Sequence, residues 1–180
     1  MPVIESATGL RFGHLNVYHL YNKVPDVSLL LNQFSQLTHL FWISETRLGS
    51  LTDGNSIRIP NCCVTRRDST QTLHTGIALY IHQSIAMFTR RRTDLESDRV
   101  ECDLVEINDI KSPGLLVEYV YRNPASPAAW FDDLHVDIYA MYTDVRTYVC
   151  ASWSVYTCVG EIMDVCVCKY VYAMACLCAD

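Results

Sequence analysis

A strand, a helix and a second strand follow one another between Leu10 and Arg47, and this stretch most constrains what the chain can fold into. The segment from Leu10 to Val17 has apolar residues among few charges, which predicts a short strand. After Pro25, apolar residues recur at three- and four-residue steps, which predicts an amphipathic helix of about three turns starting near this proline. The run Leu40–Ser44 is apolar and too short for a helix. We therefore expect a buried strand parallel to the first, with the helix as the crossover.

A polar side chain stands at the end of each predicted strand. Asn16 closes the first strand and Glu45 follows the second. Because the carboxyl ends of parallel strands meet at one edge of a sheet, where ligands gather, we expect these two side chains to lie together. The same spacing also fits a turn-capping asparagine and a solvated loop glutamate, and the residues alone leave both interpretations open.

Four short motifs lie in the same stretch: His14-Leu15-Asn16, Asn22-Lys23, the leucine-rich segment 29–34, and Ile43-Ser44-Glu45-Thr46. They resemble the opening motifs of the endonuclease/exonuclease/phosphatase superfamily, and most closely those of the endonuclease domain of LINE-type (non-LTR) retrotransposons. The resemblance implies an α/β fold that forms half of a two-sheet α/β sandwich. It also implies a hydrolase that uses Mg²⁺ to cut phosphodiester bonds in DNA.

Tyr121 ends another predicted strand, the apolar run from Leu115, and is followed by Arg122-Asn123-Pro124. This segment resembles the superfamily's third motif, in which a tyrosine hydroxyl approaches the scissile phosphate. Taken by itself, a tyrosine at a strand end is also an ordinary rim residue. The resemblance assigns Glu45 as the Mg²⁺ ligand, in keeping with the carboxylate oxygens that this ion prefers. The catalytic residues it implies are Asn16, Glu45, Tyr121 and Asn123.

Arginines are concentrated in two runs, Arg66-Arg67 and Arg90-Arg91-Arg92. One interpretation is a solvated charge run at a hairpin end. The other is a patch that positions phosphates beside the site, with Arg66, Arg67 and Arg122 as the DNA-binding residues. The chain carries 14 Lys+Arg against 20 Asp+Glu, a net charge of −6. This balance argues against a freely basic nucleic-acid binder, but it allows an enzyme that contacts a few phosphates locally.

Four further strands are predicted between Glu45 and the strand that ends at Tyr121. A short strand at 57–60 is expected to pair with the segment 62–68, and a turn ending at Gly76 leads into an apolar strand. The segment 95–107 alternates well enough for another strand, with Asp103 where an apolar residue is usual. A charge there is tolerable only on a face open to water, so we expect Asp103 to be exposed.

The superfamily's later Gly-Asp-x-Asn and Ser-Asp-His motifs are absent from these 180 residues. We therefore predict an N-terminal extension (1–9), a truncated domain (10–138) and a Cys/Val/Tyr-rich tail of no recognised family (139–180). The missing motifs would orient the attacking water and supply a histidine, and each such role is worth roughly 10²- to 10⁴-fold, so we expect no activity. The alternative is a non-catalytic scaffold or interaction protein, or a non-functional gene-prediction remnant.

Cysteine placement and hydropathy give weaker expectations about the surroundings of the chain. Of nine cysteines, Cys62, Cys63 and Cys102 are expected to be reduced thiols of an intracellular protein, nuclear or cytoplasmic. The N-terminus has no pattern of a secretory signal, and the longest uncharged stretch of the tail is too short to span a bilayer. DNA is the expected partner and a membrane is not. The sequence leaves the oligomeric state open.

Overall fold

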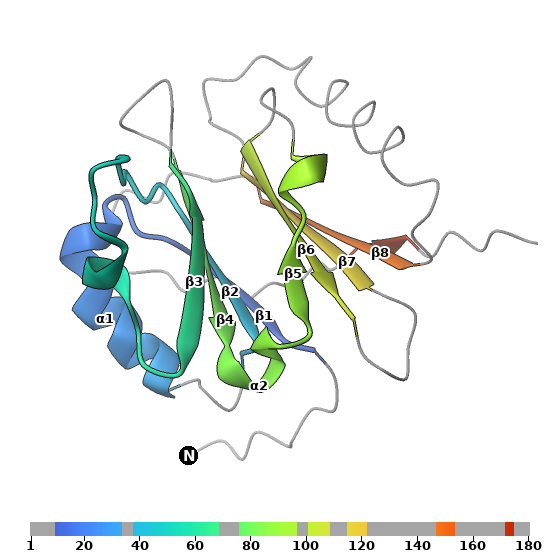
Figure 1. The fold of residues 1–180 in the computed structure, drawn as a ribbon, viewed down its shortest axis with the longest axis horizontal. Coiled ribbons are helices and arrows are strands. Elements are labelled where there is room, and N and C mark those ends of the chain that lie inside the picture. The colour runs from blue at the N-terminus through green and yellow to red at the C-terminus, as the bar shows by residue number, and fades with distance from the viewer. Residues whose placement is uncertain are drawn as a thin grey trace, which may run out of the picture.

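The computed structural model describes residues 10–33, 38–68, 76–96, 101–108, 115–121, 147–153 and 172–174. They form a four-stranded sheet in the order β1-β2-β4-β3 and a five-stranded sheet in the order β5-β6-β7-β8-β9 (Figure 1). The fold is a partial α/β sandwich, as the sequence predicts, and strands of both sheets contribute to it. None of the helices described is long and apolar enough to cross a membrane.

The first sheet is built on the predicted strand, helix and strand. Strand β1 (Phe12–Asn16) lies parallel to β2 (Leu40–Ser44), with Asn16 opposite Ser44, and helix α1 (Leu20–Gln33) connects the two. Every residue of β2 is buried, because α1 covers one face and the second sheet covers the other. The prediction for this unit is therefore confirmed.

Helix α1 begins at Leu20, earlier than the sequence pattern predicts, and Pro25 lies inside it. A proline there lacks the N–H that would bond to the carbonyl four residues earlier, which normally weakens a helix. Tertiary contacts compensate in the first turn, since Leu20 is fully buried and its backbone N–H donates to the Thr46 carbonyl at 2.9 Å. The predicted apolar positions Phe34 and Leu37 lie outside the described residues.

The other edge of the first sheet is an antiparallel hairpin of β3 (Cys62–Arg67) and β4 (Ile77–His82), and β4 also pairs with β2. The prediction of a strand at 57–60 is wrong. Residues Gly54–Ile57 instead form a 3-10 helix, η1, capped by the Asp53 side chain, which accepts from the Asn55 N–H. The hydroxyl of Tyr80 donates to the Ile57 carbonyl at 2.8 Å and so holds η1 against the sheet.

The second sheet begins after the short helix α2 (Gln83–Ala86) and contains β5 (Thr89–Arg91), the 3-10 helix η2 (Thr93–Leu95), β6 (Glu101–Ile107) and β7 (Leu115–Tyr121). Strand β6 is thus shorter at its start than predicted. Strands β8 (Thr147–Trp153) and β9 (Tyr172–Met174) extend the sheet beyond β7. Both come from the segment predicted as a tail, and the boundary at residue 138 stays a prediction.

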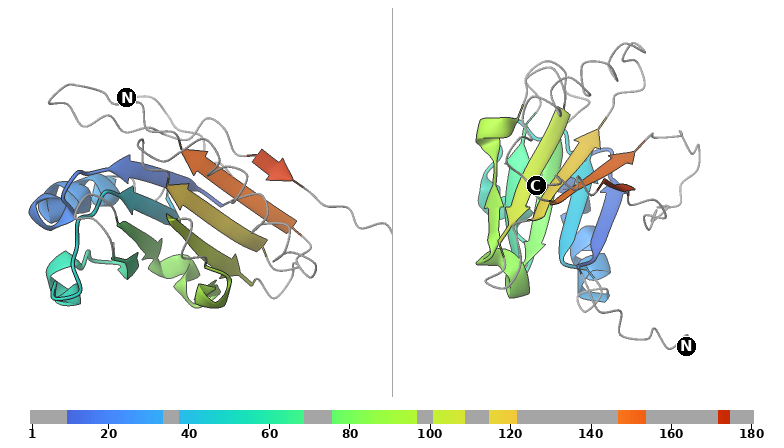
Figure 2. Two further views of the ribbon diagram at one scale, coloured as in Figure 1. Left: turned by 90° about the horizontal axis from the view of Figure 1, so that it is seen from above. Right: turned by 90° about the vertical axis from the view of Figure 1, so that its right-hand side faces the viewer.

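Two apolar clusters hold the layers together. One lies between α1 and the first sheet and includes Leu20, Val27 and Ile43. The other lies between the two sheets and includes Trp42 and Tyr119. Figure 2 shows the resulting order of layers, with the first sheet between α1 and the second sheet. The residues that end β1, β2 and β7 therefore lie where the two sheets face each other.

Asp103 of β6 is buried between the sheets, so the expectation that it faces water is wrong. It is 2% exposed, and its Oδ2 accepts from Trp42 Nε1 at 3.1 Å while Oδ1 lies 2.9 Å from Arg91 Nε. Burial raises the pKa of Asp103 to about 6, and the neighbouring Arg91 charge opposes that rise. The buried charge is tolerated because both of its oxygens have partners.

Candidate active site

Three separate strands each bring one side chain to the candidate site. Asn16 is the last residue of β1, Glu45 directly follows β2, and Tyr121 is the last residue of β7. Asn16 Nδ2 donates to Glu45 Oε1 at 2.7 Å, and the Tyr121 hydroxyl donates to the same oxygen at 2.8 Å. The prediction that Asn16 and Glu45 lie together is confirmed, and Tyr121 joins them from the second sheet.

The backbone at Glu45 explains how this carboxylate reaches its partners. In a continued strand, Glu45 would point to the α1 side of the sheet together with Phe41 and Ile43. Instead its φ is 53°, in the left-handed region that costs a non-glycine residue about 1–2 kcal/mol. Hydrogen bonds to a charged group contribute about 1.5–3 kcal/mol each, so the two donors to Oε1 offset this strain.

The amide of Asn16 is oriented by a local contact. Its Oδ1 accepts from the backbone N–H of Tyr18 at 3.2 Å, so Nδ2 faces Glu45. Both donors engage Oε1 of Glu45, and no hydrogen bond from another described residue engages Oε2. The carboxylate is therefore held in one orientation with one oxygen available to a ligand.

A second polar layer lies beneath the site. His14 Nε2 is 3.0 Å from Ser44 Oγ, and the His14 ring stacks on Tyr119 with 5.3 Å between centroids. Trp42 stacks on the same tyrosine at 5.6 Å. Burial lowers the pKa of His14 to about 4, so its imidazole is neutral at pH 7. His14 thus supports the strand ends and is not poised for proton transfer at neutral pH.

The free oxygen of Glu45 fits a magnesium ion that keeps most of its waters. Mg²⁺ is commonly bound through one or two carboxylates and otherwise by water and substrate phosphate. Among the described residues, no group of three His, Cys, Asp or Glu side chains gathers as a metal cage. Glu45 is the carboxylate that the sequence predicts as the ligand, and the lack of such a group among the described residues predicts weak binding.

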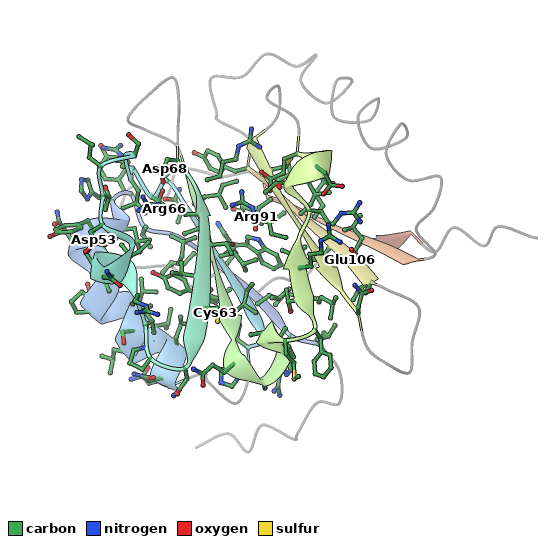
Figure 3. The ribbon with its side chains drawn as sticks, viewed as in Figure 1. Asp53, Cys63, Arg66, Asp68, Arg91 and Glu106 are labelled. Atoms are coloured by element: carbon green, nitrogen blue, oxygen red, sulfur yellow. The ribbon has the colours of Figure 1, made fainter. Side chains whose placement is uncertain are left out.

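The arginines that the sequence assigns to phosphate already have partners. Arg66 Nε lies 3.3 Å from Asp68 Oδ1, near the end of β3 (Figure 3), and its Nη2 donates to the Thr52 carbonyl. Arg67 donates to the Cys102 carbonyl at 3.2 Å. Their role in DNA binding stays a prediction, as do the roles of Arg122 and Asn123, which lie outside the described residues. Cys62, Cys63 and Cys102 form no disulfide bond.

Sequence reasoning missed a pair of residues beside the site. The guanidinium carbon of Arg47 lies 3.4 Å from the centroid of the Tyr18 ring. A signal was available, because Tyr18 stands two positions after Asn16 and Arg47 two positions after Glu45. Residues that follow the two strand ends at equal distance emerge at the same edge of the sheet.

Solved structures with a similar fold include proteins described as a phosphatase bound to DNA and as an AP endonuclease. The 3′ phosphatase NExo from Neisseria, bound to a product DNA hairpin, aligns with 80% of this chain and 57% of its own, at 15% identity and a TM-score of 0.56. AP endonuclease LMAP from Leishmania major aligns with 79% of this chain and 54% of its own, at 13% identity and a TM-score of 0.58. The catalytic domain of Xenopus laevis APE2 aligns with 79% of this chain and 57% of its own, at 14% identity and a TM-score of 0.56.

These matches define the class of the fold. The chain has the fold of the endonuclease/exonuclease/phosphatase superfamily, as its motifs predict. It spans a little over half the length of these structures, 57% and 54% for the first two. No protein-family model matches the sequence, and no curated protein matches it either.

Proposed function

We propose that the chain is part of a Mg²⁺-dependent DNA endonuclease of the LINE retrotransposon type, and that these 180 residues do not hydrolyse DNA by themselves. The observation that carries the proposal is the shared oxygen of Glu45, which accepts from both Asn16 and Tyr121. Structural neighbours described as an AP endonuclease and as a phosphatase bound to DNA support it. The motifs around Asn16 and Glu45 support the retrotransposon type.

Each residue of the site has a role under this proposal. Glu45 would hold the ion through Oε2, and the ion would neutralise charge that develops on a phosphate oxygen. Asn16 and Tyr121 orient the Glu45 carboxylate, so this carboxylate is already in position before the ion binds. The Tyr121 hydroxyl has one hydrogen, so it would donate to a phosphate oxygen only by releasing Glu45 Oε1, with Asn123 as the neighbouring polar group.

The missing step is activation of water. Within these 180 residues no Gly-Asp-x-Asn or Ser-Asp-His segment supplies a general base or a late histidine. His14 does not replace them, because it is buried and its pKa, lowered to about 4, makes it a weak base. Groups of this kind act as a unit, so binding without turnover is the expected outcome.

Two measurements on the full chain test the proposal. Electron paramagnetic resonance of Mn²⁺, a stand-in for Mg²⁺, should report a weak site that Glu45→Gln abolishes. Asp26→Asn is the matched control, because it removes an exposed carboxylate on α1, on the outer side of the first sheet. Supercoiled plasmid incubated with Mg²⁺ should remain uncut by the wild-type chain.

Either measurement can contradict the proposal. Equal Mn²⁺ binding by wild type and Glu45→Gln would remove the metal role of Glu45 and favour the non-catalytic scaffold. Plasmid nicking by wild type, but not by Glu45→Gln, would overturn the predicted inactivity while supporting the site.

A further inference from the structure

Tyr18 and Arg47 form a stacked pair at the rim of the candidate site. Tyr18 lies just beyond β1 and is tied to Asn16, whose Oδ1 accepts its backbone N–H at 3.2 Å. Arg47 lies just beyond β2, two residues after Glu45. The Arg47 guanidinium rests 3.4 Å from the Tyr18 ring centroid, well inside the range of a cation–π contact. The pair is thus anchored to both strands that supply the site.

Backbone strain is concentrated at the same edge. The φ angles of Tyr18, Glu45 and Arg47 are 53°, 53° and 52°, in the region that residues other than glycine and asparagine seldom adopt. Each such residue costs on the order of 1–3 kcal/mol and persists only where the surroundings impose it. Strain at Glu45 aims its carboxylate, and strain at Tyr18 and Arg47 places their side chains against each other.

Arg47 differs from Arg66, Arg91 and Arg92 of the two basic runs in having no acid beside it. Arg66, Arg91 and Arg92 each pair with a carboxylate within 3.3 Å. No carboxylate of the described residues lies within ion-pair distance of Arg47. The Nε atom of Arg47 is buried and has no hydrogen-bond partner among these residues. The charge of Arg47 is therefore oriented by an aromatic ring and left for an anion.

Tyr18 offers a second binding feature. Its side chain is 63% exposed although one face of the ring carries the guanidinium. An exposed aromatic face beside an oriented guanidinium matches the base and phosphate of one nucleotide. A base can stack there only if it is not already stacked inside a duplex.

We propose that Arg47, held on the Tyr18 ring, binds a phosphate of a nucleic-acid strand at the rim of the Asn16–Glu45–Tyr121 site, and that Tyr18 stacks an unpaired base of that strand. This inference rests on the proposed function, because it places a second phosphate of the same substrate beside the one at Glu45. It assigns to Arg47 and Tyr18 the positioning role that the sequence assigned to Arg66 and Arg67.

Fluorescence anisotropy with a labelled single-stranded oligodeoxythymidylate tests the proposal on the full chain, in EDTA and over a series of salt concentrations. The association constant K falls as salt rises, so the slope of log K against log salt is negative. Arg47→Gln should make this slope shallower by about 0.7, the value for one phosphate contact on a single strand. Tyr18→Ala should weaken binding on the order of tenfold or more, as expected for one stacked base, whereas Tyr18→Phe should bind like wild type. An oligonucleotide carrying abasic residues should bind wild type as weakly as the normal strand binds Tyr18→Ala.

Arg58→Gln is the matched control, since it removes one exposed arginine whose guanidinium contacts Asn55 on the η1 side of the molecule. It should bind like wild type, and circular dichroism should give all variants the same thermal midpoint. The proposal is overturned if wild type does not bind the oligonucleotide or if Arg47→Gln keeps the wild-type salt slope. It is also overturned if Arg58→Gln makes the slope shallower by as much as Arg47→Gln does.

The two proposals fail in distinguishable ways. Because the anisotropy experiment contains no metal, loss of Mn²⁺ binding at Glu45 with intact Arg47-dependent binding would refute the proposed function alone. If Mn²⁺ binds normally and the Arg47→Gln variant binds the oligonucleotide with the wild-type salt dependence, this inference alone is refuted.

Discussion

Replacing Asp103 by alanine would remove the buried carboxylate that joins the two sheets. The Trp42 Nε1–H would lose its acceptor, and an orphaned buried donor costs about 1–3 kcal/mol. Arg91 would lose its contact with Oδ1, and breaking a buried ion pair costs about 3–5 kcal/mol when the remaining charge is uncompensated. Arg91 keeps Glu96, to which it donates at 2.7 and 3.0 Å, so the second cost falls below that range.

We therefore expect Asp103→Ala to lower the free energy of unfolding by about 3–4 kcal/mol, a large part of the 5–15 kcal/mol typical of a domain. Asp103→Asn should cost about 2 kcal/mol, because one carbonyl oxygen can satisfy only one of the two donors. Urea unfolding followed by circular dichroism measures both. The control is Asp94→Ala, which removes an exposed partner of Arg92 and should leave the midpoint near that of wild type.

The reasoning about Asp103 would be refuted by an Asp103→Ala variant within about 1 kcal/mol of wild type. That result would mean that water reaches Trp42 and Arg91 between the sheets. An unchanged dependence of unfolding on urea concentration is required for the comparison, since a changed slope would indicate a different unfolded or native state.

Two further predictions concern pH and backbone conformation. The pKa of Asp103 is raised to about 6, which adds stability at pH 4 that is lost as the pH rises to 6. The pKa of His14 is lowered to about 4, which adds stability at pH 6.5 that is lost as the pH falls to 4. Relative to wild type, Asp103→Asn should therefore gain stability with rising pH between 4 and 6, and His14→Gln should lose it, each by roughly 2 kcal/mol in urea titrations. Gly76→Ala should cost about 2 kcal/mol or more by the same assay, because Gly76 has φ of 107° and an added Cβ would lie 2.5 Å from Thr46 Oγ1.

Each of these two predictions has an outcome that contradicts it. Parallel pH profiles for wild type, Asp103→Asn and His14→Gln would show that neither group changes its proton affinity on folding. Gly49→Ala is the control for Gly76, since nothing lies within 4 Å of a Cβ added at Gly49. Equal losses at the two glycines would remove the argument from φ and from Thr46.

The strand, helix and strand around Asn16 and Glu45 were predictable because local spacing determines them. Strand β2 is short and buried on both faces, so its five residues are all apolar or small, and α1 buries one face at helical spacing. The nearness of Asn16 and Glu45 follows from the parallel strands, but their hydrogen bond also requires the left-handed backbone at Glu45. Tyr121 joins them only through the packing of two sheets, which its sequence motif indicated and spacing did not.

The features that the sequence missed depend on contacts between distant residues. The Trp42 partner of Asp103 lies 61 positions away, so the alternation of β6 could not show that its charge would be satisfied when buried. Helix α1 starts before Pro25 because Leu20 packs into the core, a tertiary effect that outweighs the preference of proline for the first turn. The Tyr18–Arg47 pair requires two left-handed backbone positions that neither residue type announces.

The central claim is that Glu45, oriented by Asn16 and Tyr121, binds a divalent ion at the edge shared by the two sheets. Paramagnetic broadening of backbone amide signals by Mn²⁺ tests this most directly, because broadening falls steeply with distance from the ion. The account predicts loss of signal around Asn16, Glu45 and Tyr121 in the wild-type chain and recovery of those signals in Glu45→Gln. Broadening centred elsewhere on the molecule, or unchanged in Glu45→Gln, would contradict it.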